Sequence, residues 1–191
     1  MIRVSGGFLR GRQMPVPGGG VRPTQDKVRQ ALFSSLGPIV DGCRFLDLFA
    51  GSGSVGLEAW SRGAAFVCWV EKDPRVAGVL KHNIESLCGE GGGRPGVPGT
   101  LVVKADAIQF VLKSAMDRPF DVIFADPPYG SDREGGWLKK TLQALMSRPM
   151  LAPNGFFVAE QGGDEPVAEY GEWHPFKERT YGKTRLLYWQ K

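Results

Sequence analysis

The sequence predicts one α/β domain built on a doubly wound, mostly parallel β-sheet. Short apolar runs rich in β-branched and aromatic residues alternate with amphipathic stretches, in units of about 25 residues. Turn residues bound most of these runs, as expected of buried strands in a parallel sheet. A chain of 191 residues, 42% of them hydrophobic, is long enough to bury a sizeable core in a single domain.

The alternation predicts individual strands and helices. Strands are expected at 44–49, 66–70, 101–104, 120–125, 155–160 and 185–189. Helices are expected at 24–36, 54–62, 74–87, 107–116 and 137–146, with Thr24 and Asp73 as N-caps of the first and third. The last strand follows a stretch, 161–175, that shows no clear helix, and this favours an antiparallel orientation. Residues 89–99 are rich in Gly and Pro and are expected to form a loop.

The N-terminal 22 residues form a candidate extension of the main domain, which we expect to cover 23–191. A β-hairpin with its turn near Gly6 and Gly7 would place Arg10 and Arg12 on one face. A basic face of this kind suggests a nucleic-acid partner, the alternative being an ordinary solvated surface. The first 30 residues carry six basic side chains against one acidic one, namely Arg3, Arg10, Arg12, Arg22, Lys27 and Arg29 against Asp26.

Composition argues against several other classes of protein. No apolar run approaches the roughly 20 residues that a membrane span needs, and the N-terminus lacks the apolar segment of a signal peptide. The three cysteines, Cys43, Cys68 and Cys88, are widely spaced and odd in number, which suits neither a disulfide framework nor a zinc site. We therefore expect buried thiols, no metal ion, and a monomer that acts in the cytoplasm.

A glycine motif follows the first predicted strand. Gly51-Ser52-Gly53-Ser54-Val55-Gly56 fits the pattern G-x-G-x-x-G between a strand and a helix, where glycines let the backbone approach a ligand closely. Glu71 ends the second strand, 20 residues after Gly51, where an acidic residue can bind the ribose hydroxyls of a nucleoside. This pattern fits NAD as well as S-adenosylmethionine.

Three further features favour S-adenosylmethionine. Asp47 stands just ahead of the glycines, where a carboxylate can meet an ammonium group but would repel a pyrophosphate. Asp106 and Ala107 follow the third strand and could bind the adenine amine, although Asp106 also suits a plain helix N-cap. The third feature is Asp126-Pro127-Pro128-Tyr129, which hydride transfer does not need.

Asp126-Pro127-Pro128-Tyr129 follows the fourth predicted strand, at the edge of the sheet where ligands bind in open α/β folds. The carboxylate of Asp126 and the carbonyl of Pro127 can accept the two N–H bonds of an amine on a base, while Tyr129 stacks on the ring. The amine lone pair would then face the methyl donor. A base inside a duplex could not reach such a pocket, so the target would be unpaired or flipped out. A simple turn is the alternative.

The runs 47–53 and 126–129 resemble class I methyltransferases that act on the amino group of adenine or guanine. Residues 6–12, 15–17 and 22–24, with Val28, Arg29 and 31–33, resemble more specifically the bacterial 16S rRNA guanine-N2 methyltransferases, the RsmD family. The resemblance covers nearly the whole chain. It implies a Rossmann-like class I methyltransferase sheet of seven strands with the last one antiparallel, and methylation of one guanine (guanine-966) in the small ribosomal subunit. Gln30 departs from the family, in which Glu is usual.

The resemblance also implies roles for individual residues. The catalytic residues would be Asp126, Pro127 and Tyr129. The S-adenosylmethionine-binding residues would be Gly51, Gly53, Glu71, Asp106 and Ala107, in addition to Asp47, which its position ahead of the glycines selects. Arg10, Arg12 and Arg22 are candidates for RNA contact, the alternative being ordinary surface arginines.

Three other functions remain as alternatives. A DNA adenine-N6 methyltransferase has the same motif order, but this chain leaves little room for a target-recognition domain. A nicotinamide-dependent oxidoreductase shares the glycine motif but has no need for Asp126-Pro127-Pro128-Tyr129. A non-catalytic RNA-binding module would have no reason to keep the glycines and acidic residues intact.

Overall fold

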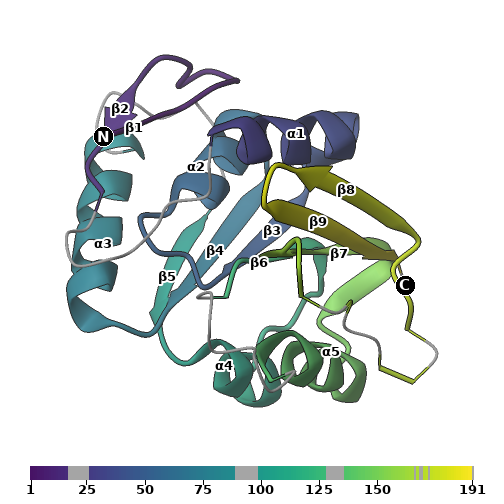
Figure 1. The fold of residues 1–191 in the computed structure, drawn as a ribbon. Helices are drawn as coiled ribbons and strands as arrows, with labels where there is room; N and C mark the ends of the chain where they lie inside the picture. Colours follow the sequence, from purple (N-terminus) through teal and green to yellow (C-terminus); the bar gives the residue numbers. More distant parts are fainter. Residues whose placement is uncertain are drawn as a thin grey trace.

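The fold is a central seven-stranded sheet with helices on both faces and a small two-stranded sheet beside it (Figure 1). The computed structural model describes residues 1–16, 26–88, 99–127, 136–165, 167, 170, 171 and 173–190. Within these ranges the strand order of the large sheet is β5-β4-β3-β6-β7-β9-β8. The predicted fold class is confirmed.

Five strands of the large sheet run parallel to one another, since β3 pairs in parallel with β4 and β6, β4 with β5, and β6 with β7. Within the described part of this sheet only β9 runs the other way, because it is antiparallel to both β7 and β8. The bounds are β3 Arg44–Leu48, β4 Phe66–Glu71, β5 Thr100–Lys104, β6 Phe120–Ala125, β7 Leu151–Gly162, β8 Lys177–Tyr181 and β9 Thr184–Gln190. The antiparallel orientation of the last strand is thus confirmed.

The helices form two layers that bury opposite faces of the sheet (Figure 1). Helices α1 (Asp26–Leu36), α2 (Ser54–Ser61) and α3 (Pro74–Cys88) cover the face that carries Phe45, Trp69 and Phe124. Helices α4 (Ala107–Lys113) and α5 (Trp137–Ser147) cover the face that carries Leu46, Val70 and Ala125. A 3-10 helix, η1 (Gly37–Val40), ends α1. Neighbouring strand residues alternate between the two layers, as the pleat requires.

The predicted starts and ends of these elements are largely confirmed. Asp73 caps α3, because its Oδ1 accepts the backbone N–H groups of Arg75 (2.7 Å) and Val76 (3.1 Å). The strand expected at 155–160 is longer, since β7 begins at Leu151. Thr24 and the loop expected around 89–99 lie mainly outside the described residues.

The N-terminal arm, residues 1–16, differs from its prediction. Strand β1 (Ile2–Arg3) pairs with β2 (Gln13–Met14), and the turn falls at 8–11 instead of at Gly6-Gly7. Arg10 and Arg12 therefore lie in a loop, and the expectation that a strand aligns them on one face is wrong. Both side chains are nevertheless exposed.

The arm docks on the C-terminal half of α2, and this contact explains where its chain turns. The N–H of Phe8 donates to the carbonyl of Ser61 (2.9 Å), and the Ser61 hydroxyl donates to the carbonyl of Gly6 (2.6 Å). Gly7 has φ +73°, and a Cβ there would lie 1.8 Å from the Ser61 carbonyl oxygen, so only glycine fits. Four arm residues, Ile2, Val4, Leu9 and Met14, join the same buried cluster as α1 and α2.

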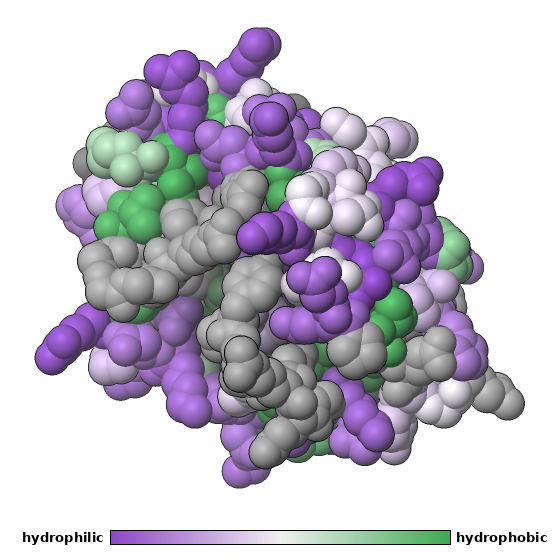
Figure 2. Space-filling view, in the orientation of Figure 1, coloured by the Kyte–Doolittle hydropathy of each residue, from purple (hydrophilic) through white to green (hydrophobic). Residues whose placement is uncertain are grey.

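The surface is mainly hydrophilic on the face shown in Figure 2, where hydrophobic atoms appear as small separate patches. No helix among the described residues is long and apolar enough to span a membrane. Cys43 and Cys68 are buried free thiols, as expected.

Candidate active site

Four neighbouring strands, β5, β4, β3 and β6, end within one residue of the same level, and β7 passes that level and continues to Gly162. Leu48 of β3 is in register with Val70 of β4 and Ala125 of β6, and the row extends to Val103 of β5 and Ala159 of β7. One position further along these five strands lies a row of residues at the carboxyl end of the sheet, which we call the edge row. The edge row consists of Lys104, Glu71, Phe49, Asp126 and Glu160. Predicted site residues that are distant in the sequence are thus brought to one edge.

The glycine motif lies between β3 and α2 and packs against the buried side chain of Trp69. Gly51 and Gly53 have φ values of +54° and +82°, which other residues adopt only with strain. The indole Nε1 of Trp69 donates to the Gly53 carbonyl at 3.2 Å. A Cβ on Gly56 would lie 2.2 Å from the same nitrogen. The third glycine therefore serves close packing of α2 on the sheet, while the first two shape the loop.

Glu71 fixes this loop to the end of β4. Its Oε2 accepts the backbone N–H of Gly51 at 2.9 Å, and its Oε1 accepts the N–H of Asp73 at 2.8 Å. Each carboxylate oxygen can accept more than one hydrogen bond, so ribose hydroxyls could be added to this arrangement. Ribose binding by Glu71 stays a prediction that this geometry accommodates.

Asp47 is buried below the loop, with 2% of its surface exposed. Its Oδ2 accepts the backbone N–H of Gly56 at 2.9 Å and so holds the first turn of α2. Burial raises the pKa of this carboxyl to about 8, the Gly56 hydrogen bond opposes the rise, and the charge of Glu71 adds to it. The described partner of Asp47 is thus the protein backbone, and contact with a ligand ammonium stays a prediction.

Asp106 is the N-cap of α4, which is the alternative that the sequence left open. Its Oδ1 accepts the N–H groups of Ile108 (3.1 Å) and Gln109 (3.2 Å), and its Oδ2 pairs with Lys72 at 3.2 Å. Burial acts to raise the pKa of Asp106, but these backbone bonds and Lys72 outweigh it and lower the pKa. Capping leaves adenine binding by Asp106 and Ala107 as a prediction.

Asp126 and Pro127 are half-buried at the end of β6, and Asp126 interacts with its surroundings there. The other predicted catalytic residue, Tyr129, lies outside the described residues, as do Pro128 and the RNA-contact candidate Arg22. The other two RNA-contact candidates, Arg10 and Arg12, are exposed on the loop of the arm, well separated along the chain from the edge row.

The edge row contains two residues that the sequence analysis did not select. Phe49 has φ +63°, a strained conformation for a residue with a side chain, and its ring meets Trp137 edge-on at 5.8 Å. Glu160 follows Ala159 directly, beside Asp126, and only 4% of its surface is exposed. The signal for Glu160 was available, because this acidic residue stands at the end of the apolar run predicted as a strand at 155–160, although β7 itself continues to Gly162.

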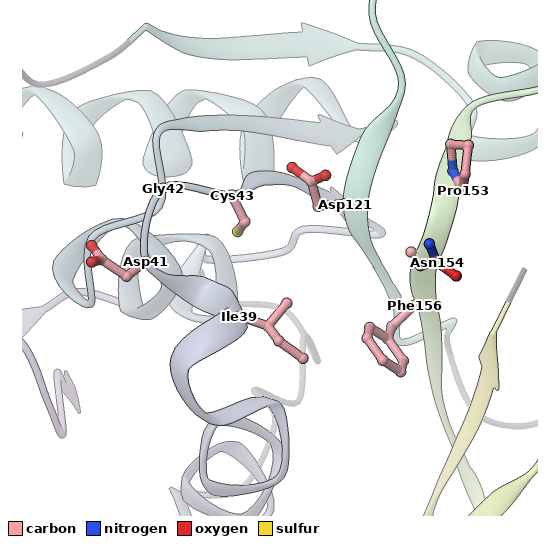
Figure 3. Close-up of a pocket in the computed structure, with 9 residues that line it drawn as sticks. Ile39, Asp41, Gly42, Cys43, Asp121, Pro153, Asn154 and Phe156 are labelled. Carbon is pink, nitrogen blue, oxygen red and sulfur yellow. The ribbon is translucent and has the colours of Figure 1, made fainter.

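A cavity of about 400 Å³ lies at the opposite end of the strands from the edge row, near the amino ends of β3 and β6 (Figure 3). Its lining includes Ile39, Cys43, Asp121 and Phe156. Asp121 has a structural task there, since its Oδ2 accepts the backbone N–H of Arg44 at 2.8 Å. This position separates the cavity from the edge row, so we do not assign it to the candidate site.

Comparison with known proteins supports the fold and the family. The Haemophilus influenzae ribosomal RNA small subunit methyltransferase D is 35% identical, over 95% of this chain and 89% of that protein. Its Escherichia coli counterpart is 33% identical, over 100% of this chain and 90% of that protein. The solved structure of the Escherichia coli protein yhhF covers 100% of this chain and 97% of its own, with a TM-score of 0.81 and 33% identity.

A more distant structure, an RNA methyltransferase from Salinibacter ruber in complex with S-adenosyl-L-homocysteine, shares the fold. Its TM-score is 0.62 at 17% identity, and it covers 88% of this chain and 93% of its own. The model of the family described as Conserved hypothetical protein 95 matches residues 2–190. This chain therefore belongs to the Conserved hypothetical protein 95 family, the family of the RsmD methyltransferases that its motifs resemble.

Proposed function

We propose that this protein transfers a methyl group from S-adenosylmethionine to the exocyclic N2 amine of a guanine in 16S rRNA of the small ribosomal subunit. Membership of the family, and the names of relatives that match the chain over nearly its full length, support rRNA of the small subunit as the substrate. It would act in the cytoplasm, where these subunits are present.

The observation that carries the proposal is the juxtaposition on the edge row. Asp126 follows β6, the glycine loop follows β3, and these two strands are hydrogen-bonded neighbours in register. Glu71 joins them from the other side of β3. A nucleoside cofactor held by the glycine loop and Glu71 would therefore lie next to an amine held at Asp126, which is what group transfer between the two requires.

The residues present fit S-adenosylmethionine. Gly51 and Gly53 carry no side chain and their positive φ values let the loop turn sharply after β3, while Glu71 offers carboxylate oxygens beside the Gly51 amide. The cofactor would supply an electrophilic methyl group on sulfonium. Asp47 would face the ammonium group of the cofactor, and Asp106 would bind its adenine amine.

The protein's own task is to orient the amine and exclude water. The guanine N2 lone pair is delocalised into the ring, so the free amine is a poor nucleophile. Asp126 and the Pro127 carbonyl would accept its two N–H bonds and turn the lone pair towards the methyl group. Once the nitrogen carries the methyl group, it would lose one of its two protons to Asp126 or to water. Most of the rate would then come from positioning, which can contribute about 7–11 kcal/mol.

RNA contacts would come from the basic arm. Arg10 and Arg12 are exposed on a loop that α2 holds in place, so the arm can present charge to phosphates without having to fold first. We assign the extension 1–22 to RNA contact and 23–191 to the catalytic domain. The target base must be unpaired or flipped out to reach Asp126.

The experiment is transfer of labelled methyl from S-adenosylmethionine to small ribosomal subunits that lack the modification. Free 16S rRNA and duplex DNA serve as parallel substrates, and the products are digested to nucleosides. We expect N2-methylguanosine from the subunits. N6-methyladenine from DNA would replace the proposal with the adenine methyltransferase alternative, and the absence of label in every substrate would refute it.

A further inference from the structure

Asn83 connects two segments that the proposed function assigns to different ligands. It lies on α3 and is fully buried. Its Nδ2 donates to the carbonyl of Ser52, in the glycine loop, at 3.0 Å and to the carbonyl of Pro15, in the arm, at 3.1 Å. An amide nitrogen has two hydrogens, so these two bonds use both.

The amide oxygen of Asn83, Oδ1, is buried and forms no hydrogen bond with the described part of the chain. A buried acceptor without a partner is unfavourable, and leucine would fill a similar volume without that penalty. The two donated bonds are therefore what this asparagine supplies at this position. Both fix backbone carbonyls outside its own helix.

The arm is anchored a second time, on the helix that the glycine loop leads into. The Ser5 backbone N–H donates to Glu58 Oε2 at 2.8 Å, and the Ser5 hydroxyl donates to Glu58 Oε1 at 2.7 Å. Glu58 lies on α2, which begins directly after Gly53. The loop is thus bonded to Asn83 and continues into α2, and the arm is bonded to both Asn83 and α2.

We propose that Asn83 is a positioning residue that couples the arm to the glycine loop, so that RNA and cofactor strengthen each other's binding. The inference rests on the proposed function, which assigns the loop to S-adenosylmethionine and the arm to RNA. A cofactor that fixes the position of the Ser52 carbonyl would also fix the Asn83 side-chain amide. That amide in turn holds the Pro15 carbonyl of the arm. By linkage, RNA that orders the arm favours the cofactor by the same factor.

Hydrogen exchange on the unaltered protein tests the coupling without any substitution. The probe is S-adenosyl-L-homocysteine, with its binding verified by calorimetry. We expect the amides of Val4, Leu9 and Gly11 in the arm to exchange at least about threefold more slowly when it is bound, because their bonds belong to the docked arm. Unchanged exchange in the arm, with the probe bound, would overturn the inference.

A substitution then tests whether Asn83 carries the coupling. Asn83→Asp keeps the shape but presents oxygens to both carbonyls. The dissociation constant of S-adenosyl-L-homocysteine is measured with and without unmethylated small subunits. The ratio should be at least about fivefold in the wild type and fall to about one in Asn83→Asp. Glu85→Gln, at an exposed site on the same helix, is the control and should keep the wild-type ratio.

The outcomes separate this inference from the proposed function. A wild type that binds neither the probe nor the subunits would refute the proposed function. A wild type that binds both with a ratio of one, or an Asn83→Asp protein that keeps the wild-type ratio, would refute only the coupling. If Asn83→Asp fails to fold, as seen by thermal melting, the exchange result alone decides.

Discussion

At the scale of single residues, the third glycine of the motif, Gly56, acts through close packing against Trp69. Gly56→Ala would place a methyl group 2.2 Å from Trp69 Nε1, and Trp69 is fully buried. We expect a loss of about 1–3 kcal/mol in the free energy of unfolding, measured with urea. Gly78→Ala is the matched control, because nothing among the described residues lies within 4 Å of a Cβ there. It should stabilise α3 by up to about 1 kcal/mol, and equal effects of the two would contradict the account.

Asp47 makes a second prediction at this scale, on pH. Its pKa is about 8 in the folded protein against 3.8 for the unconstrained group, so the folded state holds the proton more tightly. Its contribution to stability is fully present below pH 3.8 and is lost as the pH rises towards 8. An asparagine side chain at this position could still accept the Gly56 bond, but it does not titrate.

Asp47→Asn should therefore flatten the fall of the unfolding free energy between about pH 5 and pH 8, measured by urea denaturation at several pH values. Parallel pH profiles for the two proteins would show that Asp47 does not titrate in this way.

At the scale of elements, the arm depends on one buried carboxylate. Glu58 is fully buried and accepts hydrogen bonds from Ser5 and from Arg62 Nε (2.8 Å), and the Nε of buried Arg29 lies 3.5 Å away. Three segments of the chain, the arm, α1 and α2, meet at this group. A buried charge that loses its partner is strongly unfavourable, which makes Glu58 central to arm docking.

Glu58→Gln should lower the free energy of unfolding by about 1–3 kcal/mol, because Arg29 keeps Asp26 Oδ1 at 2.9 Å as a second partner, and it should expose the arm loop to protease. Urea denaturation and limited proteolysis with mapping of the cut sites measure the two effects. The exposed Glu85→Gln substitution should change neither. An arm that stays protected in Glu58→Gln would show that Ser61 and the apolar contacts are sufficient to dock it.

The elements also show what sequence can and cannot predict. Strands such as Phe120–Ala125 were predicted because apolar runs between turns have few other solutions. Strand β8, Lys177–Tyr181, was not predicted from the residue pattern. It is a polar strand at the outer edge of the sheet and has no apolar face. The arm turn was misplaced because Gly7 is required by Ser61, a contact far away in sequence.

The candidate site likewise has features that could be predicted from the sequence and features that could not. Gly51, Glu71 and Asp126 were predictable, since each stands at a strand end and such ends meet in a parallel sheet. The structural tasks of Asp47 and Asp106, and the link through Asn83, were not. They depend on which backbone amide or carbonyl lies within hydrogen-bonding distance, and strand periodicity does not determine that.

At the scale of the whole molecule, the fold places the residues that we assign to the cofactor and the residue that we assign to the chemistry at the ends of different strands. The glycine loop continues from β3, Glu71 ends β4 on one side of that strand, and Asp126 follows β6 on the other. The arm, α2 and α3 form a connected body around the loop through Glu58 and Asn83. On the proposed function, we therefore predict that a substitution of Asp126 removes methyl transfer without loss of cofactor binding.

The most direct test of this central claim is Asp126→Ala, assayed for both binding and transfer. We predict that its dissociation constant for S-adenosyl-L-homocysteine stays within about threefold of the wild type, while methyl transfer to unmethylated small subunits falls at least about a hundredfold. Asp117→Ala, at an exposed site before the same strand, should leave both unchanged. Transfer by Asp126→Ala at the wild-type rate would contradict the account and place the chemistry elsewhere.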